Sequence, residues 1–368
     1  MNNFEAILKR IPVKTWQRLG INEAGAVFSM PEGKSFGSGN ADIRVSEQVI
    51  VEPGFAAPAP EEDAAAFFVP EKMGRFIDEH SNIRYCIRIP KGHKEEKPIL
   101  IELSMDSREP VLIDDVVIIA EEGSAASIVI KYISEGGAAV RHSGRTRVIL
   151  RRNAKVKLVK IQMLGGQSGH FDAVGGFVEE RAQLDVILAE LGAGKPFSSC
   201  NLVLAGEGGG ANLDVVYLGD GRRTLDMSYR AEHRGRETVS HICAKGILLA
   251  QSRKVLRDTL DFVSGASGSK GREEESVLVL SPKVKNVSVP LLLCGEDDVE
   301  GEHAVTSGSP DEEVLFYLMS RGIGEADARI LLAQAAVSSI VEKIPDEPIR
   351  RAVLGAVRRA VERGGRRN

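Results

Sequence analysis

The amino-acid sequence predicts a mainly β protein with a strand-rich core over residues 86–308 and helical segments at both ends. Three observations support this fold class. Short runs of Val, Ile and Leu recur through the core, polar breaks that often contain glycine separate them, and apolar residues at helical spacing occur before and after the core. Because the strands follow one another without helices between them, a fold of alternating strands and helices is excluded.

The apolar runs are four to eight residues long and rich in β-branched residues. They occupy residues 116–120, 127–133, 147–150, 156–162, 184–191, 201–205, 213–218, 276–280 and 287–293. The polar breaks centre near residues 123, 154, 182, 208, 235, 252 and 282, so most lie 26–31 residues apart, with one gap of 17. This loose period is typical of a β-solenoid, in which each coil buries its inner face against the next. A β-sandwich also contains many short strands, and the spacing leaves both architectures open.

Residues 1–85 are interpreted as a small mixed, largely helical region with loose connections. Its first helix is predicted from apolar residues at helical spacing, namely Phe4, Ile7, Leu8 and Ile11. A second short turn is expected around Trp16 and a proline-rich loop over residues 53–70. One more short helix is expected over residues 70–80.

Residues 309–368 form the third predicted unit, a helical domain. Ser309 to Glu312 read as a capping box with a proline at the first helical position, and Gly322 ends that helix. The second helix is predicted from an apolar stripe of Ile330, Ala333, Val337, Val341 and Ile344. A third helix, capped by Asp346, carries Ile349, Val353, Val357 and Val361.

Composition excludes several classes of protein. With 43% hydrophobic and 27% charged residues, the 368-residue chain forms a sizeable core. The formal net charge of −4 does not suit a general polyanion binder, so nucleic acid is not an expected partner. No apolar run approaches the ~18 residues of a membrane helix, and no membrane association is expected. The four separated cysteines form no disulfide framework and the first residues are not a secretory signal, which favours a reducing cytoplasm.

No catalytic signature is present. The sequence lacks GxxxxGK[ST], HExxH and GxSxG motifs, so we expect neither enzymatic activity nor a nucleotide on this chain. The glycine-rich piece GEGGGANLD, residues 206–214, lies between two predicted strands and is interpreted as a turn.

The segment 294–313, CGEDDVEGEHAVTSGSPDEE, carries the densest set of possible metal ligands. Thiolate, imidazole and carboxylate are ligand types for iron or zinc, and Cys294, Glu302 and His303 supply one of each. In an extended strand, Gly301 and His303 share one face and Glu302 lies on the other. The alternative is a charged edge strand followed by a polar turn.

The other candidate ligands have simpler explanations. His241 and Cys243 form an H-x-C pair that is either half of a ligand set or, preferably, part of the core. Cys86 and Cys200 are expected to be core thiols. The remaining histidines are expected on the surface: His80, His93, His142, His170 and His233.

The run EGEHAVTSGSPDEEVLFYLMSRGIGEADARILL, residues 300–332, resembles the C-terminal signature of the SufB/SufD family. That signature joins a strand of the x-H-x-A-T-x-[SG] type to D-E-x-x-[LF]-F-Y-L-x-S-R-G-[IL] and an acidic-Ala-Arg helix. Residues 240–260 are similar to the SKGI-type strand of the family. The resemblance covers residues 240–345, and residues 90–240 match by pattern.

The resemblance implies a cytoplasmic, non-catalytic subunit of the SUF iron–sulfur cluster assembly machinery. It implies a right-handed parallel β-helix with helical ends that pairs with itself or with a SufB-like chain. The helical domain would dock a SufC-type ABC ATPase, which binds the nucleotide. The docking motif corresponds to Glu312, Phe316, Tyr317, Arg321 and Gly322.

Within the resemblance, His303 matches a histidine proposed to hold a transient iron–sulfur cluster or iron, and Cys294 is a possible substitute ligand beside Glu302. SufB-like chains carry a Glu after that His, where this chain has Ala304, and a Cys in the strand that here reads LSPKVKNVSVP. The departures favour a SufD-like subunit. Two alternatives remain: a β-helix enzyme acting on acidic polysaccharide, and a solenoid that only binds another protein.

Overall fold

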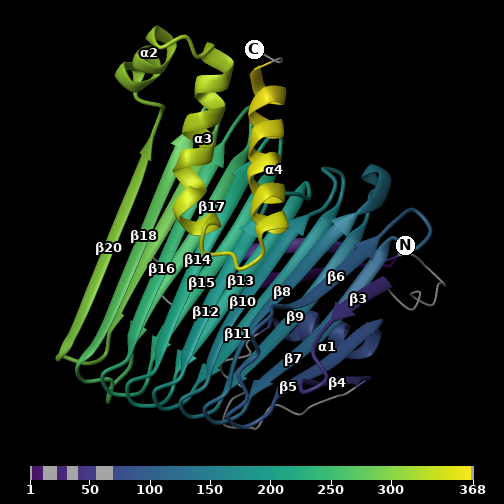
Figure 1. Ribbon diagram of the computed structural model, residues 1–368, viewed down its shortest axis with the longest axis vertical. Helices are drawn as coiled ribbons and strands as arrows, with labels where there is room; N and C mark the ends of the chain where they lie inside the picture. The colour runs from purple at the N-terminus through teal and green to yellow at the C-terminus, as the bar shows by residue number, and fades with distance from the viewer. Residues whose placement is uncertain (1, 11–22, 31–39, 55–68, 366–368) are drawn as a thin grey trace.

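The computed structural model describes residues 2–10, 23–30, 40–54 and 69–365. Its body consists of two nine-stranded sheets that face each other (Figure 1). Consecutive strands alternate between the sheets, and strands two apart in sequence pair in parallel, so the chain winds as a β-solenoid of about 8 turns. The parallel pairing excludes the β-sandwich that the spacing left open, because hairpin-linked sandwich strands pair antiparallel.

We call the two sheets the even sheet and the odd sheet after their repeating strands. The even sheet contains β6 (Ile99–Met105), β8 (Ala125–Ser134), β10 (Lys155–Met163), β12 (Gln183–Glu190), β14 (Gly210–Gly219), β16 (Val239–Leu248), β18 (Ser269–Val279) and β20 (Val299–Gly308). The odd sheet contains β5 (Ile83–Ile89), β7 (Val111–Ala120), β9 (Arg141–Leu150), β11 (Gly169–Val178), β13 (Lys195–Leu204), β15 (Thr224–His233), β17 (Arg253–Phe262) and β19 (Lys285–Cys294). A short 3-10 helix, Glu135–Gly137, follows β8.

Each coil has two corners, and this explains the irregular gap of 17 residues in the sequence spacing. The break near residue 235 joins β15 to β16, whereas the break near residue 252 joins β16 to β17 at the opposite corner. Residues with positive φ recur at one corner, including Asn153 (59°), Arg181 (53°) and Glu237 (54°). Most residues avoid this left-handed conformation, so its repetition shows that the corner geometry is imposed by stacking of the coils.

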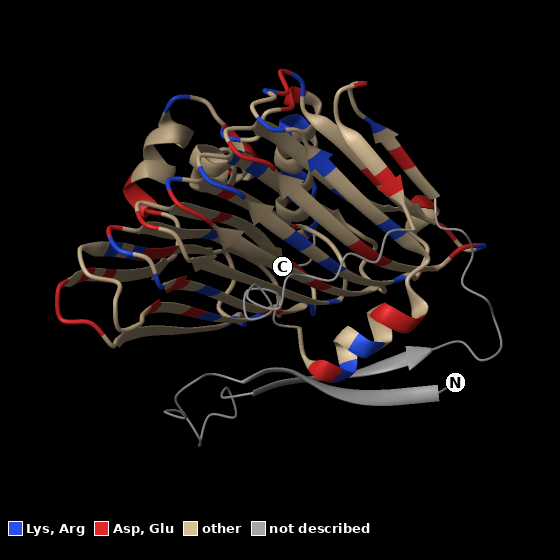
Figure 2. Ribbon diagram, turned by 90° about the horizontal axis from the view of Figure 1, so that it is seen from below, with Lys and Arg blue, Asp and Glu red and all other residues tan. Residues whose placement is uncertain are grey.

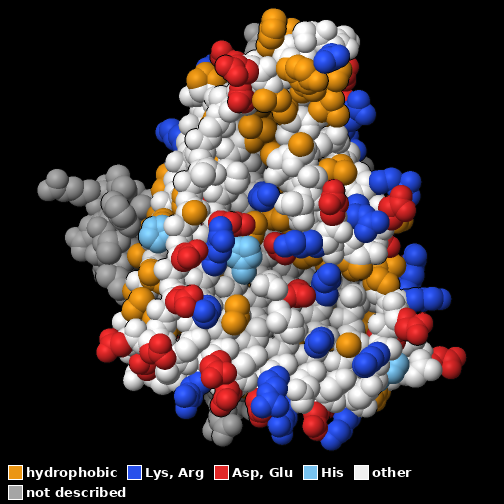
Figure 3. Space-filling view, turned by 60° about the vertical axis from the view of Figure 1, so that its left-hand side comes forward, with side chains coloured by type: hydrophobic (Ala, Val, Ile, Leu, Met, Phe, Trp, Pro, Cys, Tyr) orange, Lys and Arg blue, Asp and Glu red, His pale blue; other side chains and the backbone are white. Residues whose placement is uncertain are grey.

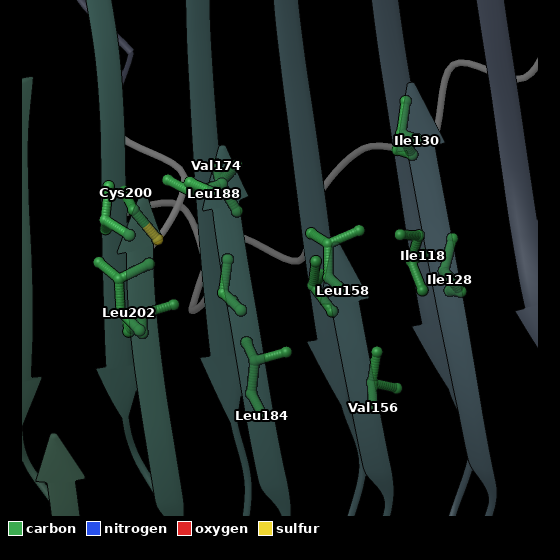
Figure 4. Close-up of a cluster of buried hydrophobic side chains, with 14 of the residues drawn as sticks. Ile118, Ile128, Ile130, Val156, Leu158, Val174, Leu184, Leu188, Cys200 and Leu202 are labelled. Atoms are coloured by element: carbon green, nitrogen blue, oxygen red, sulfur yellow. The ribbon is translucent and has the colours of Figure 1, made fainter. Parts of the chain in front are cut away.

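The interior of the solenoid is lined by stacked aliphatic side chains. Figure 4 shows residues such as Ile118, Ile128 and Leu158 meeting between the two sheets. Cys200 lies in the same cluster with 1% exposure, and Cys86 is buried between outer-face aliphatic residues, so the expectation of two core thiols is confirmed. Full burial of one such aliphatic side chain stabilises the fold by roughly 1.5–3 kcal/mol.

The two ends of the solenoid differ. At the N-terminal end, β3 (Asn40–Arg44) pairs antiparallel with β6, and β4 (Ile50–Pro53) pairs antiparallel with β5. At the C-terminal end, β19 and β20 each pair with a strand on one side only, within the described residues. At the N-terminal end, β3 and β4 are also edge strands in the described residues, but they are short and antiparallel, so we call this end the capped end and the end formed by β19 and β20 the open end.

The described residues of the N-terminal region form mostly strands, so its interpretation as largely helical is wrong. Residues Asn2–Arg10 form strand β1, which pairs antiparallel with β2 (Glu23–Met30), so the predicted first helix is wrong. A short segment without a cap forms a marginal helix on its own, and pairing with a second strand satisfies its backbone groups instead. The turn expected at Trp16 lies outside the described residues, as does most of the loop over residues 53–70.

The helix expected over residues 70–80 is confirmed as α1 (Glu71–His80). It lies on the outer face of the odd sheet, where Met73, Phe76 and Ile77 pack against Phe171 and Phe197 (Figure 2).

Three helices follow the solenoid: α2 (Glu312–Ser320), α3 (Glu325–Val341) and α4 (Glu347–Gly365). The predicted stripes of α3 and α4 are buried against the outer face of the even sheet (Figure 1). Asp311, not Ser309, caps α2, because its carboxylate accepts the backbone N–H of Glu313 at 2.8 Å. The predicted end at Gly322 is confirmed by its positive φ of 87°. In the described part of the chain, no helix is long and apolar enough to cross a membrane.

Candidate functional site

The last coil, β19 and β20, leaves the C-terminal end of the interior open. Gly301 faces this interior, because a Cβ atom on it would lie 2.6 Å from Cδ1 of Leu292 on β19. Side chains alternate along a strand, so His303 faces the same interior. His303 is exposed, since no further coil covers it in the described part of the chain.

A buried pair of carboxyl groups lies beneath His303. The register partner of His303 on β18 is Glu273, which shares a hydrogen bond with Asp258 of β17 in the opposite sheet. Burial, reinforced by the charge of Glu275, raises the pKa of Glu273 to about 8. Burial and the Glu273 carboxyl also raise the pKa of Asp258 well above its ordinary value. Two carboxyls in contact cannot both ionise easily, so the pair favours its protonated forms.

A compensated ion pair lies in the same part of the interior. The ammonium group of Lys254 is 2.5 Å from Oε1 of Glu275 and donates to Oγ of Ser288 at 2.9 Å. The hydroxyl of Tyr217 donates to the same carboxylate at 2.6 Å. Lys254, Glu275 and Tyr217 are buried, so each interaction replaces hydration lost on folding. The interior of the open end is thus polar, which the apolar strand pattern did not predict.

A sequence signal for these acidic residues existed in β18. Within GREEESV, Glu273 and Glu275 alternate with Glu274, and they share a face with Gly271 and Val277. Period-two alternation therefore places two of the three glutamates inside once the strand itself is recognised. Only residues 276–280 of this strand were predicted, so the inward glutamates were missed.

The structure does not bring the three predicted ligands together. Cys294 is an exposed free thiol at the last residue of β19. The next strand, β20, begins at Val299, and His303 lies four residues, or about 13 Å, further along it. Glu302 lies on the outer face, where its register partner is Arg272. Among the residues that the structure describes, no group of three or more His, Cys, Asp and Glu side chains is arranged to hold a metal ion.

Three histidines expected on the surface are buried in the interior, so that expectation is wrong for them. His142, His170 and His233 are at most 4% exposed. Nε2 of His142 is 2.5 Å from Oδ1 of Asp114, and Nδ1 of His142 is 2.7 Å from Nδ1 of His170. Nδ1 of His233 is 2.7 Å from Oγ1 of Thr238. Their polar sequence neighbours suggested solvent, but those neighbours point out of the sheets while the histidines point in.

Burial shifts the pKa values of His142 and of the carboxyl groups near it. Burial lowers the pKa of His142 to about 3 and raises the pKa of Asp114 to about 7. At the other side of His170, burial raises the pKa of Glu190 to about 7. Solenoid coils lie on both sides of this cluster, which separates it from the open end.

His241 and Cys243 lie on the outer face of the even sheet. Nε2 of His241 is 3.5 Å from Oε1 of Glu274. Cys243 is 5% exposed and packs among residues that contact α3, and burial together with Glu274 raises the pKa of its thiol to about 12. A thiol held protonated in a packed cluster fits the expectation of a core residue.

Helix α2 presents the largest exposed apolar side chains of the described residues. Phe316 is 73% exposed and Tyr317 is 55% exposed, and no residue of α2 is buried. Figure 3 shows hydrophobic side chains gathered at the end of the molecule where α2 lies. The guanidinium of Arg321 lies 5.2 Å from the centre of the Tyr317 ring. Glu312 and Phe316 line a groove between α2 and the solenoid corner at Pro282.

Comparison with known proteins identifies the family. The sequence profile described as "SUF system FeS cluster assembly, SufBD core domain" matches residues 103–336, which is more than half of the chain. The chain belongs to the SufB/SufD family. The family match runs from β6 into α3, so it contains the open end, the buried carboxyl pair and α2.

Curated relatives support the SufD-like assignment within the SufB/SufD family. The iron-sulfur cluster assembly protein SufD of Bacillus subtilis is 26% identical over 302 residues, which cover 79% of this chain and 69% of the relative. An iron-sulfur cluster assembly SufBD family protein of Staphylococcus haemolyticus is 26% identical over 267 residues, which cover 71% of this chain. The chain spans 56% of the length of that staphylococcal relative.

Proposed function

We propose that this chain is a non-catalytic, SufD-like subunit of a cytoplasmic SUF complex that pairs through its open end and takes part in cluster assembly. The observation that carries the proposal is the difference between the two ends of the solenoid. Short antiparallel strands cap one end, whereas the long strands β19 and β20 each have one edge without a partner in the described part of the chain, beside His303. Unpaired edge strands favour addition of another chain, either a second copy or a SufB-like chain.

Iron or a transient iron–sulfur cluster is the proposed cargo of the open end. His303 supports this role because its imidazole is exposed and has no hydrogen bond or ion pair with another described residue. A neutral imidazole binds iron through a ring nitrogen. Cys294 and Glu302 lie on the same last coil but apart from His303, so further ligands would come from the chain that covers this end.

The second proposed interface is α2, which would dock a SufC-type ABC ATPase. Its exposed aromatic residues, Phe316 and Tyr317, are of the type that dominates protein interfaces. ATP binding and hydrolysis would take place on that partner.

A movement of the docked ATPase would be transmitted to the solenoid through contacts of α3 and of the segment that follows it. The ammonium group of Lys343 is 2.7 Å from Oδ1 of Asp214 on β14. Lys245 of β16 donates to Oγ of Ser339 at 2.8 Å. A pull on the helices would therefore strain the even sheet, whose last strand carries His303.

The deciding experiment is anaerobic reconstitution of the complex with its ATPase and partner chain. The variant His303→Ala should assemble and support ATP hydrolysis but lose cluster formation or delivery, measured by visible absorption and transfer to an apo-acceptor. His93→Ala, which changes a half-buried histidine near the capped end, is the matched control and should behave as wild type. Cys294→Ala and Glu302→Ala test the two other candidates. Wild-type cluster yield from a normally assembled His303→Ala complex would leave His303 with a structural role only.

A further inference from the structure

No cation of the described residues contacts the two carboxyl groups beneath the open end. Asp258 and Glu273 are each 2% exposed and hydrogen-bond to each other from opposite sheets. Within the described residues, neither forms an ion pair with a lysine, arginine or histidine. Adjacent buried carboxyls repel each other when ionised, so a site of this kind favours whatever positive charge can reach it.

The neighbouring Lys254 acts on Asp258 only through its charge, because its direct contacts are to other groups. Lys254 forms its ion pair with Glu275 and also donates to the backbone carbonyl of Val287 at 3.2 Å. Oδ1 of Asp258, by contrast, is buried and has no hydrogen-bond partner among the described residues. A buried acceptor without a donor carries the full cost of desolvation, which is uncommon in folded proteins.

The open end gives a small ion access to this pair. Glu273 is the register partner of His303, and Asp258 is the register partner of Pro290. His303 and Pro290 belong to the last coil, so one layer of side chains separates the carboxyls from solvent. His303 is exposed and has no hydrogen bond to another described residue, so its side chain is free to turn about its χ angles.

We propose that Asp258 and Glu273 form a divalent-cation site that takes Fe(II), with His303 turning inward to add a nitrogen ligand. The inference rests on the proposed function in that it supplies iron at the same open end. Carboxyl oxygens and an imidazole nitrogen suit Fe(II), and binding of the ion would displace the protons that the buried carboxyls hold. No finished set of three ligands stands in place, so water or the covering chain fills the remaining positions.

The proposed site binds Fe(II) through oxygen and nitrogen atoms, without a thiolate, and this suits transient binding of the ion. Cys294 lies four residues along β19 from Pro290, the register partner of Asp258, which is about 13 Å along the strand, and does not contribute. Oxygen ligands hold Fe(II) more weakly than thiolates hold a cluster, so the ion can pass from the carboxyls to the growing cluster.

Metal titration of the full chain tests the site. Chelator-stripped protein is titrated anaerobically with Co(II), whose visible absorption reports its ligands, and then with Fe(II). Wild type should bind one ion per chain. Glu273→Gln and Asp258→Asn, which keep shape and remove charge, should each weaken binding tenfold or more. His303→Ala should weaken it less. The control is Glu190→Gln, a neutralised carboxyl in the closed middle of the solenoid, which should bind Co(II) as wild type does.

Equal Co(II) affinity in wild type, Glu273→Gln and Asp258→Asn overturns the inference, as does failure of the wild type to bind. Thermal unfolding without metal establishes that each variant is folded. Anomalous scattering from Co(II) in wild-type crystals locates the ion without any substitution, and an ion elsewhere is equally decisive against the site.

The outcomes separate this inference from the proposed function. If His303→Ala abolishes cluster formation while Glu273→Gln and Asp258→Asn bind Co(II) normally, the cargo role of the open end stands and the carboxyl site is wrong. If Co(II) occupies the carboxyls but His303→Ala forms clusters at the wild-type rate, the site stands and the proposed role of His303 fails.

Discussion

Glu190 illustrates how single residues in this solenoid depart from an apolar interior. Its carboxyl is buried, accepts a hydrogen bond from Nε2 of Gln162 at 3.2 Å and lies 3.8 Å from Nε2 of His170. A buried carboxyl stays neutral more readily than a solvated one, because its charged form loses hydration. Such residues tie the stability of the solenoid to pH.

The variant Glu190→Gln should remove part of this pH dependence. The folded-state pKa of Glu190, about 7, lies above the ordinary value of 4.5 for a glutamate, so its contribution to stability is fully present below pH 4.5 and is lost as pH rises through 7. Relative to wild type, Glu190→Gln should gain little at pH 5 and up to about 3 kcal/mol at pH 8. Urea unfolding at a series of pH values measures this difference. Parallel pH profiles would show that Glu190 is solvated or paired in solution.

Residue identity alone located only part of the candidate site. His303 was singled out because histidine among carboxylates suggests metal binding, and the strand alternation placed it correctly beside Gly301. Asp258 and Glu273 were not found, since their proximity depends on two strands in different sheets meeting across the interior. The local sequence does not indicate which residues of the two sheets face each other across the interior.

At the scale of elements, apolar strands were predictable and polar-lined strands were not. Runs such as VVIIA identified β7, whereas β11, GHFDAVGGFV, was missed because His170 and Asp172 occupy its inward positions. The helices α3 and α4 were found from stripes that the structure buries. The first segment was assigned to a helix by spacing, but its pairing with β2 decided its conformation.

Helix α2 should bind the ATPase through its exposed aromatic side chains. Phe316→Ala and Tyr317→Ala should each weaken affinity for a SufC-type ATPase tenfold or more, about 1.4 kcal/mol, without lowering the unfolding temperature. Stability should be unaffected because neither residue is buried in this chain. Titration calorimetry measures the affinity. Val239→Ser changes a similarly exposed residue on the solenoid, 53% exposed, and should bind normally. Unchanged affinity in both aromatic variants would move the docking surface away from α2.

At the scale of the whole molecule, the difference between the two ends of the solenoid supports the proposed assembly surface. The ten-residue strands β19 and β20 form the open end, and the hydrogen bond from Nδ2 of Asn286 to Oγ of Ser307 joins them at 3.1 Å. At the other end, the caps β3 and β4 are five and four residues long. Long unpaired edges invite pairing, and short ones discourage it.

A charge placed at the open end should therefore prevent pairing. Val305, 41% exposed on β20, and Val45, 39% exposed beside the capped end, form a matched pair. Val305→Lys should convert the dimer, with itself or with a SufB-like chain, to separate subunits in sedimentation velocity, because a lysine must be desolvated on contact. Val45→Lys should leave the dimer intact. The reverse result would assign pairing to the capped end.

The caps also limit how far assembly can proceed. Parallel coils can stack without limit. A solenoid with two open ends could therefore bind a further copy at each end and form a filament. Here each subunit offers one long edge pair, so two subunits that meet through it use up both. In the proposed pairing growth would stop at two, and the nine residues of β3 and β4 would keep this chain from polymerising.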